Sequence, residues 1–305
     1  MNRYGLYDLV LRSDRDPGLP EVDAGERPGE EWEVVWEAVD EPHRGLVHDV
    51  MDFDGIRRLR VWWPSEGEII LFYGDRRVRW LSGERLLEIE VDPDETDRLL
   101  LGVFLERVVA PIAMMLERPG FVALHASAMG DPDGGAWAIL GHSGAGKSTA
   151  ALHLLRQGWE LLADDLVLVD TTTGEMLPVA PTIRLFDGPE VVKEALESRY
   201  VEAYRKYLHR FSWRGPWRRR PLKGLFYLEP GDPPNRCEEI EGWEAARRVL
   251  EQAFEITDGP EGFRARRFSA LCGLTREVPV RVVRYEKDRD AEVPGQVEAI
   301  LRVTS

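Results

Sequence analysis

A chain of 305 residues can bury one large core or two modest ones. Hydrophobic residues make up 43% of it and charged residues 31%, a balance typical of a globular protein rather than a disordered chain. A net charge of −15 disfavours nonspecific nucleic-acid binding, which depends on neutralising phosphates with basic side chains. Two cysteines, Cys237 and Cys272, are too few for a disulfide framework or a zinc site.

Membrane association is not expected either. The most apolar stretch, residues 99–116, is interrupted by Glu106 and Arg107, and so lacks the roughly 18 uninterrupted apolar residues of a membrane helix. Residues 1–14 lack the apolar block of a signal peptide. We therefore expect a cytoplasmic protein without a membrane partner.

The first third of the chain predicts a small antiparallel sheet. Short apolar or alternating runs separated by turn signals predict strands over residues 4–11, 56–63, 68–73, 77–81 and 86–91. The segment Asp92-Pro93-Asp94-Glu95 has the composition of a helix start and precedes a helix predicted over residues 99–116. We predict a β-rich N-terminal domain over residues 1–91 and a second domain over residues 92–305.

The second predicted domain mixes strands with helices, which indicates an α/β fold. Strand patterns cover residues 121–129, 136–140, 161–170, 222–228 and 278–285. Helical patterns cover residues 149–155, 189–211, 243–254 and 263–274.

Residues 141–148 form a complete Walker A phosphate loop between a predicted strand and a predicted helix. Glycines in such a loop let the backbone wrap around phosphate oxygens, and N–H groups at the helix start donate to them. Lys147 is expected to reach the β- and γ-phosphates and Ser148 to bind Mg²⁺. The predicted nucleotide-binding residues are Gly141, His142, Ser143, Gly144, Ala145, Gly146, Lys147, Ser148 and Thr149.

Two adjacent carboxylates, Asp164 and Asp165, stand before the apolar run 166–169. Burying them is costly unless they meet a metal, a phosphate or hydrogen-bond donors. One is expected to hold Mg²⁺ through water and the other to accept a proton from a hydroxyl, a division of labour that phosphoryl transfer requires. Solvated aspartates at a strand end are the alternative. Asp170 competes as a Walker B aspartate, although we expect it to serve the turn that follows.

Three segments together resemble the HPr kinase/phosphorylase superfamily: HASAM at 125–129, ILGHSGAGKSTAALHLLRQGW at 139–159, and ELLADDLVLVD at 160–170. The resemblance implies a P-loop kinase core with a fold similar to that of phosphoenolpyruvate carboxykinase. It implies a catalytic role for Lys147, Mg²⁺ binding by Ser148 and proton acceptance by Asp165. Asp164 is then the assisting neighbour and a further metal ligand, and His125 is the histidine that precedes the loop.

The chain departs from the bifunctional members of that superfamily at two points. They carry a glutamate in an LEIRG-like signature as a second metal ligand, whereas Thr182 stands at the matching place in Pro181-Thr182-Ile183-Arg184-Leu185. The glycine-arginine-asparagine segment tied to phosphorolysis and to HPr contact has no evident counterpart. The chain therefore looks closer to the HPr-kinase-like proteins found beside lasso-peptide and other peptide-modification genes, whose acceptor is a peptide serine.

These features predict an ATP- and Mg²⁺-dependent kinase whose acceptor is a serine of a peptide or protein, such as a biosynthetic precursor peptide. A kinase for free serine or a similar small alcohol is one alternative, and a nucleotide-dependent switch or ATPase is another. A GTPase is disfavoured, because neither Asn2 nor Asn235, the only asparagines, begins an Asn-Lys-x-Asp motif. The basic tract at residues 213–220 is interpreted equally well as an anion-gripping segment or as a solvated loop.

Overall fold

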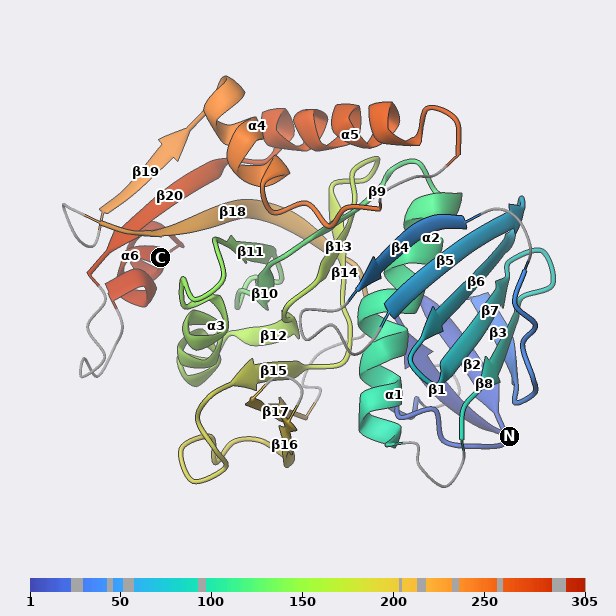
Figure 1. Ribbon diagram of the computed structural model, residues 1–305. Helices are drawn as coiled ribbons and strands as arrows, with labels where there is room; N and C mark the ends of the chain where they lie inside the picture. Colours follow the sequence, from blue (N-terminus) through green and yellow to red (C-terminus); the bar gives the residue numbers. More distant parts are fainter. Residues whose placement is uncertain are drawn as a thin grey trace. The chain divides into compact units, whose positions relative to one another are not determined.

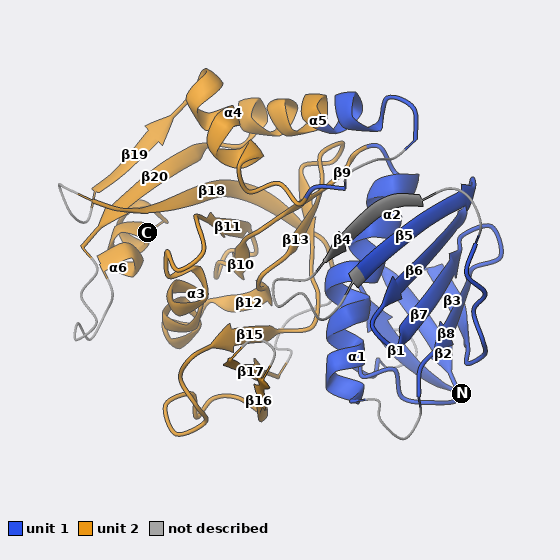
Figure 2. Cartoon of the chain, in the orientation of Figure 1, with its two compact units in different colours: residues 1–119, 255–267 blue, residues 120–254, 268–305 orange. Residues whose placement is uncertain are grey.

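The structure is a computed structural model (Figure 1). It describes residues 1–22, 30–42, 46–51, 58–92, 97–202, 205–212, 218–231, 236–256, 260–286 and 295–304. The fold is α/β with mixed sheets. Figure 2 divides the chain into two compact units: unit 1 holds Met1–Pro119 and Glu255–Arg267, and unit 2 holds Gly120–Phe254 and Phe268–Ser305. The compact units divide after Pro119. The domain boundary at residue 91 stays a prediction.

Unit 1 contains an eight-stranded sheet in the order β1-β2-β3-β8-β7-β6-β5-β4. The strands are β1 (Asn2–Leu6), β2 (Leu9–Ser13), β3 (Glu30–Val35), β4 (Leu46–Met51), β5 (Arg58–Ser65), β6 (Glu68–Tyr73), β7 (Arg76–Leu81) and β8 (Leu86–Glu90). Alternation places Val78 and Trp80 in the core while Arg77 points to solvent. The run predicted at 4–11 is a hairpin, because Tyr7 turns the chain with a φ of 51°. The sequence patterns missed β3 and β4.

A long apolar helix also belongs to unit 1. It runs through α1 (Arg98–Phe104), a π-helical stretch η1 (Leu105–Val109) and α2 (Ala110–Glu117). Asp97 caps it by accepting a hydrogen bond from the N–H of Leu100 at 3.3 Å, whereas 93–96 of the predicted cap lie outside the described residues. By length and composition the helix is able to cross a membrane, yet 89% of its most apolar window is buried in the structure.

Unit 2 is built on a nine-stranded sheet with the path β12-β10-β11-β18-β14-β13-β9, in which β20 pairs with β18 and β19 with β20. The strands are β9 (Phe121–Leu124), β10 (Ser127–Gly130), β11 (Ala136–Leu140), β12 (Glu160–Ala163), β13 (Val167–Asp170), β14 (Glu175–Leu177), β18 (Arg220–Pro230), β19 (Arg236–Ile240) and β20 (Val280–Tyr285). The pairs β11–β18 and β18–β20 are parallel.

Two runs that were predicted as single strands are each broken in the middle. The run predicted at 121–129 forms β9 and most of β10, and the run predicted at 161–170 forms most of β12 and all of β13. In each run the first and second strands lie in different parts of the sheet, because β9 pairs with β13 while β10 pairs with β12. The connections, 125–126 and 164–166, therefore cross the sheet together. His125 lies in one connection and the two aspartates in the other.

The helix predicted over residues 189–211 is wrong. The described residues there form turns followed by β16 (Glu197–Val201) and β17 (Lys206–Arg210), which make a small sheet with β15 (Thr182–Leu185) in the order β15-β17-β16. Both edges of β17 are paired, so its backbone groups are satisfied by neighbouring strands. The rings of Tyr200 and Tyr207 meet across the pair at 5.2 Å, a contact that favours strands.

The helices of unit 2 are α3 (Lys147–Arg156), α4 (Gly242–Leu250), most of α5 (Phe263–Glu277) and α6 (Gly295–Thr304). One buried cluster joins α3 and α6 to the parallel strands and to β15, through residues such as Leu154, Ile300, Phe226, Val283 and Ile183. This packing fixes the N-terminus of α3 next to the ends of β11 and β12.

Candidate functional site: a glycine-rich loop beside a buried carboxylate

The loop between β11 and α3 has a backbone that only glycine adopts readily. Gly146, the N-cap of α3, has a φ of 82°, in the left-handed region. Gly141 has a φ of 143°, and a Cβ there would lie 2.9 Å from the carbonyl oxygen of Leu228. The predicted strand–loop–helix order is therefore present, with the start of a ten-residue helix facing the loop. Backbone N–H groups and the helix dipole favour an anion at that position.

The other loop residues hold it in shape or lie on its surface. The N–H of Ala145 donates to the carbonyl oxygen of His142 at 3.0 Å, and the carbonyl oxygen of Ala145 accepts from the hydroxyl of Tyr285 at 2.5 Å. Ser143 and Gly144 are exposed, and Thr149 is half-buried in the first turn of α3. Hydrogen bonds thus hold the loop backbone at Ala145, while Ser143 and Gly144 stay accessible to solvent.

Lys147 folds back over the loop. Its Nζ donates to the carbonyl oxygen of Gly141 at 2.7 Å and to that of His142 at 3.3 Å. The pKa of Lys147 is lowered chiefly by burial, with Asp164 opposing this shift and Lys206 adding to it. An ammonium group held only by neutral carbonyls gains from an anion placed beside it, because the anion restores the charge balance that burial removes.

Asp164 is the centre of a buried polar cluster. Only 2% of the residue is exposed, and its carboxylate accepts hydrogen bonds from the hydroxyls of Ser127 and Ser148. The distance from the Ser148 oxygen to Oδ1 is 3.0 Å, and the N–H of Arg184 donates to Oδ2 at 3.2 Å. These donors satisfy the carboxylate in place of water. The alternative of two solvated aspartates is therefore wrong for Asp164.

Asp165 points in a different direction from its neighbour. Its φ of 77° is in the left-handed region, which aspartate tolerates better than most residues. Its carboxylate makes an ion pair with Arg184, and 37% of its side chain is exposed. The two adjacent carboxylates therefore have separate environments, one buried and hydrogen-bonded, the other reachable from solvent.

His125 lies beside Asp165, as the paired crossing of the two connections requires. Its Nδ1 is 3.3 Å from the carbonyl oxygen of Asp165, and its ring meets Phe254 edge to face at 6.0 Å. The pKa of His125 is lowered by the protein packed around the ring and by the positive charges of Lys147 and Arg184. The neutral imidazole is therefore favoured at neutral pH, although the residue keeps an exposed face.

His142 and Asp170 have other partners. The Nε2 of His142 is 3.0 Å from the hydroxyl of Tyr227, so this side chain packs beside the loop. Asp170 accepts hydrogen bonds from the N–H and hydroxyl of Thr172 and pairs with Arg219 at 2.8 Å. Burial alone would raise its pKa, but the bonds from Thr172 and Arg219 lower it. Asp170 serves the turn, as expected.

The basic tract is only partly described, because 213–217 lie outside the described residues. Arg219 pairs with Asp170 and Arg220 pairs with Glu160 at 2.7 Å. Lys223, on β18, is exposed.

Sequence patterns missed three polar residues of the site. Ser127 bonds to Asp164, and Arg184 contacts both aspartates, one through its N–H and the other through its guanidinium. Lys206 acts electrostatically on Lys147. Ser127 lies within the HASAM segment and Arg184 within residues 181–185, so the family-like motifs already contained both residues. No local pattern connects Lys206 to the loop.

The donor set fits Mg²⁺ held mainly by a nucleotide. Within the described residues, no group of three or more His, Cys, Asp or Glu side chains forms a ready metal site. Mg²⁺ at phosphate sites takes one or two protein oxygens and fills the rest of its shell with phosphate oxygens and water. The Ser148 hydroxyl and the Asp164 carboxylate place such oxygens 3.0 Å apart at the start of α3.

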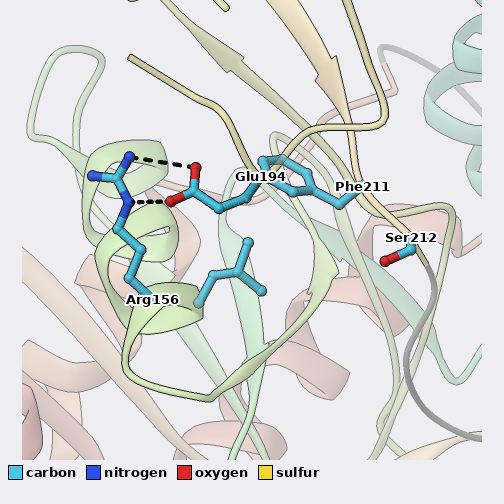
Figure 3. Close-up of a pocket in the computed structure, with 5 residues that line it drawn as sticks. Arg156, Glu194, Phe211 and Ser212 are labelled. Carbon is cyan, nitrogen blue, oxygen red and sulfur yellow. Dashed lines mark hydrogen bonds and ion pairs between the residues drawn. The ribbon is translucent and has the colours of Figure 1, made fainter. Parts of the chain in front are cut away.

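Two cavities lie at different places in unit 2. A cavity of about 170 Å³ adjoins the loop and is lined by His142, Ala145, residues 227–230, Arg247, Arg248 and Glu251. A larger one, of about 250 Å³, lies at the other end of α3 (Figure 3) and is lined by Leu155, Arg156, Glu194, Phe211 and Ser212. The predicted site residues do not line the larger cavity.

Comparison with known proteins adds a distant structural neighbour. No family model matches the chain. No curated protein matches it either. Among solved structures, the HPr(Ser) kinase/phosphatase from Coxiella burnetii aligns with a TM-score of 0.27 and 13% sequence identity, covering 60% of this chain and 89% of that chain. Similarity at this level carries no argument about activity, so the site residues stay predictions that rest on the sequence and on the geometry above.

Proposed function

We propose that this protein is a P-loop kinase that transfers the γ-phosphoryl group of ATP to a hydroxyl group, with a serine of a peptide or protein as the acceptor. One observation carries the proposal: Lys147 and Ser148 begin α3, and Ser148 bonds there to Asp164, whose neighbour Asp165 lies in the same β12–β13 connection. The acceptor class rests on the resemblance of the three motifs to HPr-kinase-like proteins of peptide-modification gene clusters.

The loop and Lys147 have the binding role. Backbone N–H groups of the loop other than that of Ala145 would donate to phosphate oxygens, and Lys147 would exchange its carbonyl partners for the β- and γ-phosphates. Ser148 and Asp164 are the residues that would hold Mg²⁺, directly or through water. When bound, Mg²⁺ neutralises the charge that develops on the phosphates.

Asp165 has the chemical role. The acceptor oxygen attacks the γ-phosphorus, the bond between that phosphorus and the β,γ-bridging oxygen breaks, and ADP leaves with the electron pair. Asp165 accepts the proton of the hydroxyl, because its carboxylate is the more accessible of the pair. His125, neutral and next to the backbone of Asp165, orients this segment.

The ion pair between Asp165 and Arg184 gives a specific reason to keep a second function in view. While Arg184 is paired with Asp165, this carboxylate accepts a proton less readily. Slow chemistry of that kind fits a nucleotide-dependent switch or a slow ATPase. A kinase instead needs the bound nucleotide to draw Arg184 toward phosphate. The two functions therefore differ in what they do with the γ-phosphoryl group.

The test is a transfer assay with γ-labelled ATP, Mg²⁺, a library of serine peptides and, separately, free serine. A kinase yields labelled peptide or labelled serine, and these two products distinguish the acceptor classes. Release of inorganic phosphate alone would support the ATPase. Calorimetry on the same preparation measures Mg·ATP binding, and failure to bind millimolar nucleotide would overturn the whole proposal.

A further inference from the structure

Lys206 shares a sheet face with Arg184. In the antiparallel pair β15–β17, Arg184 lies opposite Leu208, and Lys206 is two residues before Leu208. Opposed residues and residues two apart project to the same side of a sheet, so Lys206 and Arg184 project together. The other side of β15 carries Ile183 and Leu185, which are buried in the core of unit 2. Figure 1 shows these strands next to β12 and α3.

The environment of Lys206 connects it with the phosphate loop. The residue is half-buried, with its Nζ 4.7 Å from the centre of the Phe186 ring. The pKa of Lys206 is lowered by burial first and then by the charge of Arg184, against a smaller opposing effect of Asp164. Lys206 in turn lowers the pKa of Lys147. Geometry makes the same connection: Arg184, on the same sheet face, pairs with Asp165 and donates its N–H to Asp164. Asp164 in turn bonds to Ser148 at the start of α3.

The local charge balance favours an added anion. Three side-chain cations, Lys147, Arg184 and Lys206, stand against two carboxylates, Asp164 and Asp165, which leaves one excess positive charge. The chain as a whole carries a net charge of −15, so this positive excess runs against its composition. Placing a second lysine on the side of Lys147 is unfavourable by itself, and a phosphoryl group bound between the two would relieve the repulsion.

We propose that Lys206 is a second phosphate-binding residue, which contacts the γ-phosphoryl oxygens of the nucleotide and makes the site select triphosphates over diphosphates. This inference rests on the proposed nucleotide-binding function. Lys147 comes from the loop itself, and Lys206 comes from β17, on the sheet face that it shares with Arg184, the partner of both aspartates. A cation at that place stabilises the charge of the transferred group, which only the triphosphate carries.

The experiment is calorimetric titration with two probes, Mg·ADP and the non-hydrolysable Mg·AMP-PNP. In Lys206→Met, which keeps the aliphatic contact with Phe186, we expect affinity for Mg·AMP-PNP to fall about tenfold, as for loss of one hydrogen bond to a charged group. Affinity for Mg·ADP should change less than about twofold. Lys206→Arg should retain most of the preference. Lys193→Met, an exposed lysine between β15 and β16, is the matched control and should leave both affinities unchanged.

Each outcome decides the inference. Equal loss for both probes would overturn it, because Lys206 would then act on the loop or on the diphosphate. No change in affinity for either probe would also overturn the inference, and Lys206 would then have a role in acceptor binding or in the stability of the fold. If Lys206→Met melts below the assay temperature, Lys206→Gln replaces it. Wild-type protein that binds neither probe would instead refute the proposed function, so the two failures are distinguishable.

Discussion

The two ends of α3 differ in how deeply the polar side chains around them are buried. At the N-terminal end, Ser148 bonds to a carboxylate that is 2% exposed, and Lys147 is folded over the loop. At the C-terminal end, Arg156 and Glu194 form an ion pair with side chains 31% and 38% exposed, beside the larger cavity. An exposed pair contributes little to stability, whereas buried charge is costly unless every group is satisfied. The proposed site at the N-terminal end of α3 therefore rests on buried polar chemistry and not on cavity size.

The largest effect should follow loss of Lys147. Lys147→Ala removes the ammonium group from the phosphates while leaving a loop that is held by its backbone, so transfer should be abolished and the fold retained. Single-turnover transfer and circular dichroism measure the two properties. A folded variant with unimpaired transfer would contradict the assignment of the N-terminal end as the site.

Asp165→Asn should reduce transfer by about 10²–10⁴-fold, the usual cost of losing a general base, while nucleotide affinity changes little. Asparagine also tolerates the left-handed backbone at this position, so the loop should keep its shape. The measurement is single-turnover rate beside calorimetric affinity. Transfer at the wild-type rate would mean that Asp165 is not the base, and Asp164 would then need to be considered.

Asp164→Ala should destabilise the fold by about 3 kcal/mol, because three donors, from Ser127, Ser148 and Arg184, lose a buried acceptor. Asp164→Asn keeps one carbonyl acceptor and should cost less, while weakening Mg²⁺-dependent nucleotide binding. Urea unfolding with and without Mg·ATP measures both. If Asp164→Ala is as stable as wild type, the buried cluster does not hold the site together.

The stability of the protein should depend on pH through the protonation of His125. Its folded pKa lies below the ordinary value of 6.5, so the unfolded chain binds the proton more readily. Wild type should therefore lose stability relative to His125→Gln as pH falls from about 6.5 through the folded pKa. Melting temperatures at pH 7.5 and pH 5 test this difference.

A matched histidine stands near the other end of α3. Burial and Arg156 lower the pKa of His153 as well, so His153→Gln should show the same sign in stability but leave transfer unchanged. If the stability of wild type relative to His125→Gln were independent of pH, or increased as pH falls, this would contradict the environment described for His125.

The smallest effect is expected at the C-terminal end of α3. Glu194→Gln removes the exposed ion pair with Arg156 and should change the free energy of unfolding by less than about 1 kcal/mol. Nucleotide affinity should not change. Urea unfolding and calorimetry measure the two quantities, and a tenfold loss of nucleotide affinity would move the site to the larger cavity and reverse the comparison.

Local patterns predicted those parts of the fold in which neighbouring residues decide the structure. β6 was predicted with its observed bounds, and the glycines of residues 141–146 indicated a loop between a strand and a helix. The strand predicted over 121–129 failed at His125, because the break depends on pairing with two different partners, β13 and β11. The helix predicted over 189–211 failed for a similar reason, since β17 is specified by strands on both of its sides.

The sequence by itself predicted a glycine-rich loop between a strand and a helix, because the backbone requirements of its glycines are local, and the structure has that order. That the loop binds phosphate stays a prediction. The sequence also marked Asp164 and Asp165 as a pair, but only the tertiary structure separated them into a buried carboxylate and one held by Arg184. The approach of Lys206 to the loop depends on the register of β15 and β17, which is set by long-range pairing and burial of one sheet face. Contacts of that kind leave no short-range pattern, because their energy comes from residues distant in the chain.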